Sequence, residues 1–286
     1  KFFLMIIENK IKNVKKSISY DKRNSKKISL VPTMGSIHKG HIFLIEEALK
    51  KSDVVWVSIF INPTQFHDLN DYKNYPRSLN QDIDTIHSLS QNIRIFSPEI
   101  NEMYSKNVSY EKFDFGKIDK VMEGKYRPNH FNGVATVVSK LFDIFKPDYT
   151  FFGQKDYQQV LIVKNIINKN FNGINLITCK TIREANGLAI SSRNRLLDEK
   201  DYVNSKIIYE MLVFAKDSFN KLKISEIKEH VSNKINSIPN FELDYLDFRN
   251  SNSLKKVICS EANQNLHIFI CVKVNGIRLI DNIVVK

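Results

Sequence analysis

The fold of this chain is decided by the stretch Leu30-Val31-Pro32-Thr33-Met34-Gly35-Ser36-Ile37-His38-Lys39-Gly40-His41. Residues 28–31 form an apolar run that predicts a buried strand, and Pro32 and Gly35 predict a turn after it. Beyond the turn, apolar side chains recur at helical spacing, at Ile42, Leu44, Ile45, Ala48 and Leu49. The stretch therefore predicts a strand, a turn and a helix in direct succession.

The turn between this strand and helix is suited to binding a phosphate. In open α/β sheets, the first N–H groups of such a helix point out of the carboxyl edge of the sheet, where anions bind. His38 and His41 are three residues apart, so both can face one bound group, and Gly40 leaves the backbone bare between them. Two imidazoles there can stabilise charge on a transferring α-phosphate. Two surface histidines on an ordinary turn, or half of a metal site, are the simpler alternatives.

Composition indicates a globular protein with a sizeable core. The chain has 286 residues, of which 42% are hydrophobic and 26% are charged, enough for one large domain and a smaller one. The net charge of +12 raises the alternative of a basic nucleic-acid-binding protein that keeps an inactive nucleotide fold. The lysines are scattered along the chain, with no long basic block, so we expect no nucleic-acid partner.

The N-terminal residues and the cysteines indicate the compartment. Residues 1–7 are apolar but are soon interrupted by Glu8 and Lys10, which is too short for a secretory core or a membrane span. They predict a first strand instead. Cys179, Cys259 and Cys271 are odd in number and lack CxxC spacing, so no disulfide framework or metal knuckle is indicated. We expect a cytoplasmic protein without a membrane partner.

The order of the expected elements predicts two domains. Strands are expected at residues 53–61, 93–96, 148–152 and 175–181. They alternate with helices expected at 11–27, at 134–145 and after Ser78, which has a capping-box spacing with Gln81. This alternation predicts a Rossmann-like, doubly wound parallel sheet over residues 1–181. Residues 182–286 predict a smaller α+β lid domain, with helices at 199–222 and 224–237. Its strands are expected at 241–249, 266–274 and 277–285, the last two joined by an Asn275-Gly276 hairpin.

Polar residues collect where expected strands end. Gln65 and Gln159 are neutral amides that can hold a hydroxy acid by its carboxylate and hydroxyl without neutralising the attacking carboxylate. Surface glutamines are equally common, and the spacing alone leaves both interpretations open. Lys155 lies in a second strand-to-helix turn, where its ammonium can neutralise phosphate oxygens, although a solvated lysine is the simpler interpretation.

Five motifs in order resemble the pantothenate synthetase family, within the nucleotidyltransferase superfamily that also contains class I aminoacyl-tRNA synthetases. They are Pro-Thr-Met-Gly-x-x-His-x-Gly-His, Asn-Pro-x-Gln-Phe, Glu-Gly-x-x-Arg-x-x-His-Phe-x-Gly-Val, Gly-x-Lys-Asp-x-Gln-Gln and a degenerate Ser-Ser-Arg phosphate loop. The resemblance implies ATP-dependent condensation of pantoate with β-alanine through an enzyme-bound pantoyl adenylate, releasing pyrophosphate and then AMP. It also implies Mg²⁺ and a homodimer.

The resemblance assigns roles to single residues. The catalytic residues would be His38, His41, Lys155 and Arg193. The ATP-binding residues would be Met34, Gly40, His41, Gly153, Lys155, Asp156, Ile182, Ile190, Ser191, Ser192 and Arg193. The pantoate-binding residues would be Pro32, Thr33, Met34, Gln65 and Gln159, and Asp82 would bind Mg²⁺.

The chain departs from the family pattern at a few positions. Ile190 replaces the usual Met before the two serines, and Asn80 and Gln81 replace acids often found before Asp82. Arg127 could approach the anionic intermediate with Glu123 fixing it, or the two could form a structural ion pair; Phe131 is expected in the core. The remaining rival enzyme is a nucleotidyltransferase of the same fold that acts on another acid or a phosphate ester.

Overall fold

The computed structural model describes residues 7–104, 107–258 and 265–285. The chain divides into two compact units. The N-terminal unit comprises residues 1–119, 123–154 and 158–180, and the C-terminal unit comprises residues 120–122, 155–157 and 181–286. The main boundary follows Lys180, close to the expected one, but two short segments of the N-terminal half belong with the C-terminal unit.

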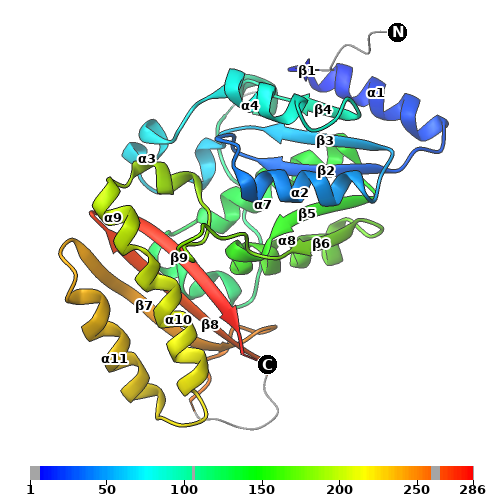
Figure 1. Cartoon of the computed structure of the whole chain (residues 1–286). Coiled ribbons are helices and arrows are strands. Elements are labelled where there is room, and N and C mark those ends of the chain that lie inside the picture. Colours follow the sequence, from blue (N-terminus) through cyan, green and yellow to red (C-terminus); the bar gives the residue numbers. More distant parts are fainter. Residues whose placement is uncertain (1–6, 105–106, 259–264, 286) are drawn as a thin grey trace. The chain divides into compact units, whose positions relative to one another are not determined.

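The N-terminal unit is built on a six-stranded parallel sheet (Figure 1). Its strands lie in the order β1 (Ile7–Glu8), β4 (Ile93–Phe96), β3 (Val54–Ile59), β2 (Ile28–Thr33), β5 (Tyr149–Gly153) and β6 (Asn175–Cys179). The predicted doubly wound α/β fold is therefore confirmed. Of the expected first strand, residues 1–6 lie outside the described residues.

The sheet reverses its winding between β2 and β5. From β2 the chain adds β3 and then β4 on one side, and later β5 and β6 on the other. The register of β2 with β3 runs over six pairs, from Ile28–Val54 to Thr33–Ile59, whereas that of β2 with β5 is Ser29–Tyr149 and Leu30–Thr150. Ligands of open α/β sheets bind beyond the strands at such a reversal.

Alternate residues of the strands face two separate cores. Leu30, Val54 and Trp56 pack against α1 (Ile11–Arg23), α7 (His130–Phe145) and α8 (Tyr157–Asn170). Val31, Val55 and Val57 pack against α2 (Lys39–Leu49) and α4 (Leu79–His87). Because both faces are covered, the strands are apolar throughout, which explains the unbroken apolar run that predicted β3.

Short helices occupy the connections between the larger elements. They are η1 (Pro63–Gln65), α3 (Leu69–Asn74), α5 (Ile100–Met103), η2 (Ile118–Lys120), α6 (Glu123–Tyr126), η3 (Gln154–Asp156) and η4 (Ser192–Leu196). Ser78 is the N-cap of α4 as predicted, but the capping-box expectation is wrong. The Ser78 hydroxyl donates instead to Asp82 Oδ1 at 3.1 Å, because that carboxylate lies one turn into the same helix.

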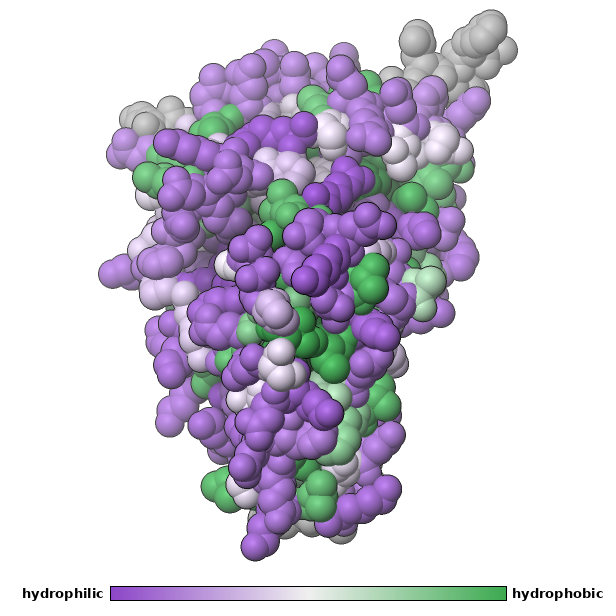
Figure 2. Space-filling view, turned by 60° about the vertical axis from the view of Figure 1, so that its left-hand side comes forward, coloured by the Kyte–Doolittle hydropathy of each residue, from purple (hydrophilic) through white to green (hydrophobic). Residues whose placement is uncertain are grey.

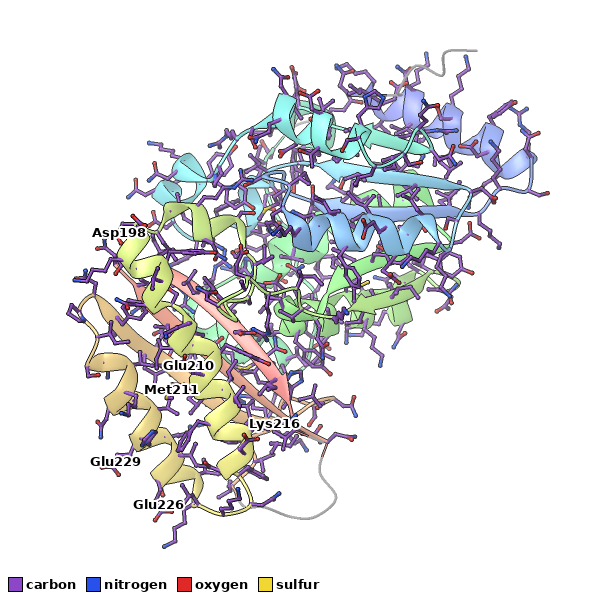
Figure 3. All side chains as sticks on the ribbon, in the orientation of Figure 1. Asp198, Glu210, Met211, Lys216, Glu226 and Glu229 are labelled. Carbon is purple, nitrogen blue, oxygen red and sulfur yellow. The ribbon has the colours of Figure 1, made fainter. Side chains whose placement is uncertain are left out.

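The C-terminal unit packs three helices on an antiparallel sheet. The helices are α9 (Glu199–Asn204), α10 (Lys206–Ser218) and α11 (Ile224–Asn236), and the strands are β7 (Phe241–Asn250), β8 (Leu266–Val274) and β9 (Ile277–Val284). Asp198, labelled in Figure 3, caps α9 by accepting the Asp201 N–H at 2.7 Å. The single helix expected over 199–222 is interrupted at Ser205, whose hydroxyl donates back to the Asp201 carbonyl.

The hairpin between β8 and β9 confirms the turn prediction. Asn275 and Gly276 have φ angles of 49° and 80°, which a tight two-residue hairpin requires at both positions.

Hydrophilic residues cover most of the face drawn in Figure 2, with hydrophobic residues in separate groups. Among residues 7–104, 107–258 and 265–285, no helix is both long and apolar enough to cross a bilayer. Cys179 and Cys271 are buried and have reduced thiols, and burial raises the pKa of the Cys179 thiol to about 11. Cys259 lies outside the described residues.

Gly133 allows α7 to lie directly against η1. A Cβ at this position would come within 2.2 Å of the Thr64 carbonyl oxygen. We expect Gly133→Ala to lower the free energy of unfolding by about 2 kcal/mol or more, because backbone must move to admit the methyl group. Urea unfolding measures this, with Gly153→Ala as control, since a Cβ there would meet no heavy atom within 4 Å. Equal stability of the two variants would contradict the close packing.

Candidate active site

The turn between β2 and α2 brings the two motif histidines together. His38 is the N-cap of α2, and its Nδ1 accepts the His41 N–H at 3.4 Å. The two rings stack with centroids 3.9 Å apart and planes 12° from parallel. A Cβ on Gly40 would come within 3.0 Å of the His38 ring. Glycine at this position therefore leaves room for the His38 ring to fold back over the first turn of the helix.

The residues before this turn are held by buried hydrogen bonds. The Thr33 hydroxyl donates to the Ser58 carbonyl at 2.8 Å and accepts the Gly35 N–H at 3.2 Å. Pro32 is half-buried near the end of β2, and Met34 follows it into the turn. Thr33 thus fixes the path of the turn. Of the three predicted pantoate contacts in this stretch, Pro32 and Met34 are more accessible than Thr33.

Gln65 lies beyond the end of β3 and contacts the same turn. Its Nε2 donates to the Met34 sulfur at 3.0 Å. Its Oε1 accepts from Asn62 Nδ2 at 3.0 Å. Asn62 is fully buried; it also donates to the Gly133 carbonyl at 3.1 Å and accepts the Tyr104 hydroxyl at 2.6 Å. Asn62 belongs to the Asn-Pro-x-Gln-Phe motif at the end of an apolar strand, but no role was predicted for it.

His130 and Arg127 hold the backbone beneath Gln65. His130 Nδ1 lies 2.7 Å from the Gln65 carbonyl, so this nitrogen carries the proton and donates. His130 Nε2 then accepts from Arg127 Nη1 at 3.3 Å. Arg127 also lies 4.0 Å from both Glu123 and Asp71. These contacts favour the structural interpretation of Arg127 and Glu123, and Phe131 is in the core as predicted.

Two adjacent glutamines follow the second strand-to-helix turn and have different surroundings. Gln158 is buried, donates to the Ile118 carbonyl at 2.7 Å and accepts the Glu123 N–H at 3.1 Å. It therefore fixes the loop that carries Glu123. Gln159, the predicted pantoate contact, is only half-buried on the next position of α8. Gly153 lies at the start of the turn, and a Cβ added there would meet no heavy atom within 4 Å.

Lys155 belongs to the C-terminal unit. Its ammonium lies 3.4 Å from Asp156 Oδ1, and its carbonyl accepts Asn282 Nδ2 at 2.8 Å. Asn282 Oδ1 in turn accepts the His267 Nε2–H at 2.7 Å. His267 is fully buried against the rings of Tyr157 and Phe269. The β8–β9 sheet therefore fixes the backbone of the motif lysine.

The predicted phosphate loop is also part of the C-terminal unit. The Ser191 side chain accepts the Arg193 N–H at 3.2 Å, and Ser191 is the N-cap of η4. Ile190 is buried, and its N–H donates to the Ile182 carbonyl at 3.0 Å. Ile190 thus has a packing and backbone role, while Ser191 and Arg193 are half-buried and Ser192 is buried.

Asp82 lies on α4 in the N-terminal unit and contacts the β2–α2 turn. Its carboxylate is 2% exposed and accepts the N–H groups of Ser36 and Ile37 at 2.8 and 2.7 Å. A cavity of about 710 Å³ in this unit, lined largely by apolar side chains, has Met34, Gly35 and Asp82 in its wall. Among the described residues, no cluster of three His, Cys, Asp or Glu residues could hold a metal ion.

The predicted site residues thus fall into two groups. The N-terminal unit carries the histidine turn, Gly153, both pantoate glutamines and Asp82, and the C-terminal unit carries Lys155, Asp156 and the Ser191–Arg193 loop. A doubly wound parallel sheet with the His-x-Gly-His turn at its winding reversal defines a nucleotide-binding α/β protein of this motif class.

Comparison with known proteins gives the family. The sequence matches the family model of the pantoate–beta-alanine ligases over residues 6–284. It is 42% identical over 262 residues to the pantothenate synthetase of Christiangramia forsetii, covering 92% of this chain and 93% of that one. It is 39% identical over 282 residues to the pantothenate synthetase of Flavobacterium psychrophilum, covering 99% and 100%. The chain therefore belongs to the pantoate–beta-alanine ligase family.

Solved structures agree with this assignment. A pantothenate synthetase from Thermus thermophilus superposes with a TM-score of 0.90 at 29% identity, covering 99% of this chain and 100% of that one. A pantoate–beta-alanine ligase from Francisella tularensis, complexed with beta-gamma ATP and beta-alanine, gives a TM-score of 0.83 at 38% identity, covering 98% of both chains.

The buried His267 makes stability depend on pH. Burial lowers its pKa from 6.5 to about 4, so the folded protein keeps it neutral where the unfolded chain protonates it. The stabilisation is complete above pH 6.5 and is lost as the pH falls from there towards 4. We expect His267→Gln to reduce the slope of unfolding free energy against pH by up to about 1.4 kcal/mol per unit. Urea unfolding at about pH 7, 6 and 5 measures this, since these values cover the upper part of that range.

His230→Gln, at an exposed position of α11, is the matched control for the loss of an imidazole. A wild-type slope in His267→Gln would show that His267 does not carry the pH dependence.

Proposed function

We propose that this protein catalyses the ATP-dependent condensation of pantoate with β-alanine, through a pantoyl adenylate bound to the enzyme. The observation that carries the proposal is the contact between Gln65 Nε2 and Met34, which joins an acid-binding amide to the turn that holds His38 and His41. Family membership over residues 6–284 supports the same reaction, as does the complex of the Francisella tularensis relative with beta-gamma ATP and beta-alanine.

The proposed reaction has two steps. A carboxylate oxygen of pantoate forms a bond to the α-phosphorus of ATP, and the bond to pyrophosphate breaks. The amine of β-alanine then attacks the carbonyl carbon of the adenylate, AMP leaves with the bridging oxygen, and the amine loses a proton. No protein nucleophile is needed, so catalysis rests on positioning and charge stabilisation.

Side chains of the N-terminal unit would hold pantoate and stabilise the α-phosphoryl group. Gln65 and Gln159 would bind the hydroxy acid, with Pro32, Thr33 and Met34 forming the adjoining wall. Neutral amides suit this role because they orient the carboxylate without cancelling its negative charge. His38 and His41, stacked at the N-terminus of α2, would stabilise charge as the α-phosphoryl group transfers.

Residues of the C-terminal unit would bind the rest of the nucleotide. Lys155 would neutralise phosphate oxygens, and Ser191, Ser192 and Arg193 would bind the departing pyrophosphate. Gly40 and Gly153, both in the N-terminal unit, would admit ATP close to the backbone. The remaining proposed nucleotide contacts are Asp156, Ile182 and Ile190.

We propose that Mg²⁺ is bound chiefly by the phosphate oxygens of ATP and by water, as is usual for this ion. The predicted protein ligand, Asp82, does not fit that role in the structure, because its buried carboxylate already accepts two backbone N–H groups and the Ser78 hydroxyl.

We further propose a cytoplasmic homodimer, as the family resemblance implies. Light scattering during size-exclusion chromatography tests the dimer: twice the chain mass of 33.3 kDa supports it, and the mass of a single chain contradicts it.

The proposed first step predicts pantoate-dependent exchange of labelled pyrophosphate into ATP, without β-alanine. The reason is that adenylation is reversible while the adenylate stays bound. Exchange with a different acid but not with pantoate would support the adenylation step and refute pantoate as the substrate. Absence of exchange with every acid tested would favour the nucleic-acid-binding alternative, which a filter-binding titration over salt then tests.

The role of His41 predicts a selective loss of turnover. His41→Ala should lower the exchange rate about a hundredfold or more, because the imidazole acts on the transition state, while pantoate affinity changes little. His87→Ala, at an exposed position on α4, is the control and should behave as wild type. An equal loss of pantoate affinity, with the single-turnover rate unchanged, would refute the role.

A further inference from the structure

We propose that Asp82 is a positioning residue whose carboxylate holds the Gly35–Ser36–Ile37 turn and thereby sets the orientation of His38 and His41. The effect on rate rests on the proposed function, whereas the effect on the turn does not. This role replaces the Mg²⁺ ligand role that the family resemblance implies for Asp82.

The carboxylate of Asp82 is engaged on both oxygens. Oδ2 accepts the Ser36 N–H at 2.8 Å, and Oδ1 accepts the Ile37 N–H at 2.7 Å and the Ser78 hydroxyl at 3.1 Å. Hydrogen bonds to an ionised carboxylate are roughly twice as strong as neutral ones. The side chain is 2% exposed, so water competes little for these donors.

The turn has a backbone conformation that needs such support. Gly35 and Ser36 both have positive φ angles, 79° and 52°. Ser36 is not a glycine, so its left-handed conformation is unfavourable and persists only where surroundings hold it. Successive N–H groups in such a segment converge on an anion. Here the anion is the Asp82 carboxylate.

Gly35 allows the carboxylate to come this close. A Cβ at Gly35 would lie 2.9 Å from Asp82 Oδ2 and 3.2 Å from the Ile59 side chain. The glycine in Thr-Met-Gly is therefore needed both for its φ angle and for the approach of Asp82.

The contacts connect α4 to the catalytic turn. The Asp82 N–H donates to the Ser78 carbonyl at 2.8 Å, so the carboxylate is fixed within the first turn of α4. Ile37 directly precedes His38, the N-cap of α2. If the Ile37 N–H moved away from Asp82, the neighbouring residue His38 would therefore move too, and the stacking of the two imidazoles would change.

Asp82→Asn tests this role because it keeps the shape of the side chain. One carboxylate oxygen becomes an NH₂ group, which would face a backbone N–H and cannot accept from it. We expect amide exchange at Ser36 and Ile37 to rise about tenfold or more, measured by mass spectrometry on the whole protein without substrates or Mg²⁺. Ser78→Ala, which removes only the hydroxyl donor, should produce a smaller rise at the same two amides.

Enzyme kinetics separate positioning from metal binding. Asp82→Asn should lower pantoate-dependent pyrophosphate exchange about tenfold or more, with the Mg²⁺ concentration for half-maximal rate unchanged. Gly35→Ala should give the same pattern, and the double variant should lose less than the product of the single losses, because both changes disturb one contact.

Unchanged amide exchange in Asp82→Asn, together with a raised Mg²⁺ requirement, would overturn the proposal in favour of a metal ligand. If Asp82→Asn does not fold, unchanged exchange of both amides in Ser78→Ala would overturn it as well. If the wild-type protein shows no exchange with pantoate, the proposed function fails, while the amide measurement still decides the role of Asp82.

Discussion

The adjacency of β2 and β5 is the constraint on which the rest of the N-terminal unit depends. The sheet grows away from β2 on one side and away from β5 on the other, so both strands deliver their following turns to the same reversal point. One turn carries the stacked His38 and His41, and the other begins at Gly153 with open space above it. The two apolar cores on either face keep the strands fixed, which leaves the carboxyl edge to the polar residues.

Buried polar side chains hold the segments around the predicted site residues in each unit. Asn62 joins η1 to the α7 backbone, and Asp82 joins α4 to the β2–α2 turn. Gln158 and Asn282 do the same for the Glu123 loop and for Lys155. Each group tolerates burial because these hydrogen bonds replace its contacts with water, and an unpaired group would be costly. The geometry of the candidate site therefore depends on these buried side chains.

Much of this architecture could be predicted from local sequence patterns. Continuous apolar strands, the helical spacing after His41 and the Asn275-Gly276 turn each encode their structure within a few residues. The break at Ser205 could not be predicted, because apolar spacing continues across it; at this point the Ser205 hydroxyl donates to the Asp201 carbonyl. The partners of Asp82 and Lys155 could not be predicted from the sequence either. Lys155 and Asn282, for example, are 127 residues apart in sequence, and only tertiary packing brings them together.

The central claim is that the reaction passes through a pantoyl adenylate, and transfer of a labelled oxygen tests it most directly. Pantoate labelled with oxygen-18 in its carboxylate would be turned over with ATP and β-alanine, and the products analysed by mass spectrometry. Attack of the carboxylate on the α-phosphorus predicts one labelled oxygen in AMP and the other in the new amide. Label in inorganic phosphate or pyrophosphate, with unlabelled AMP, would contradict the account.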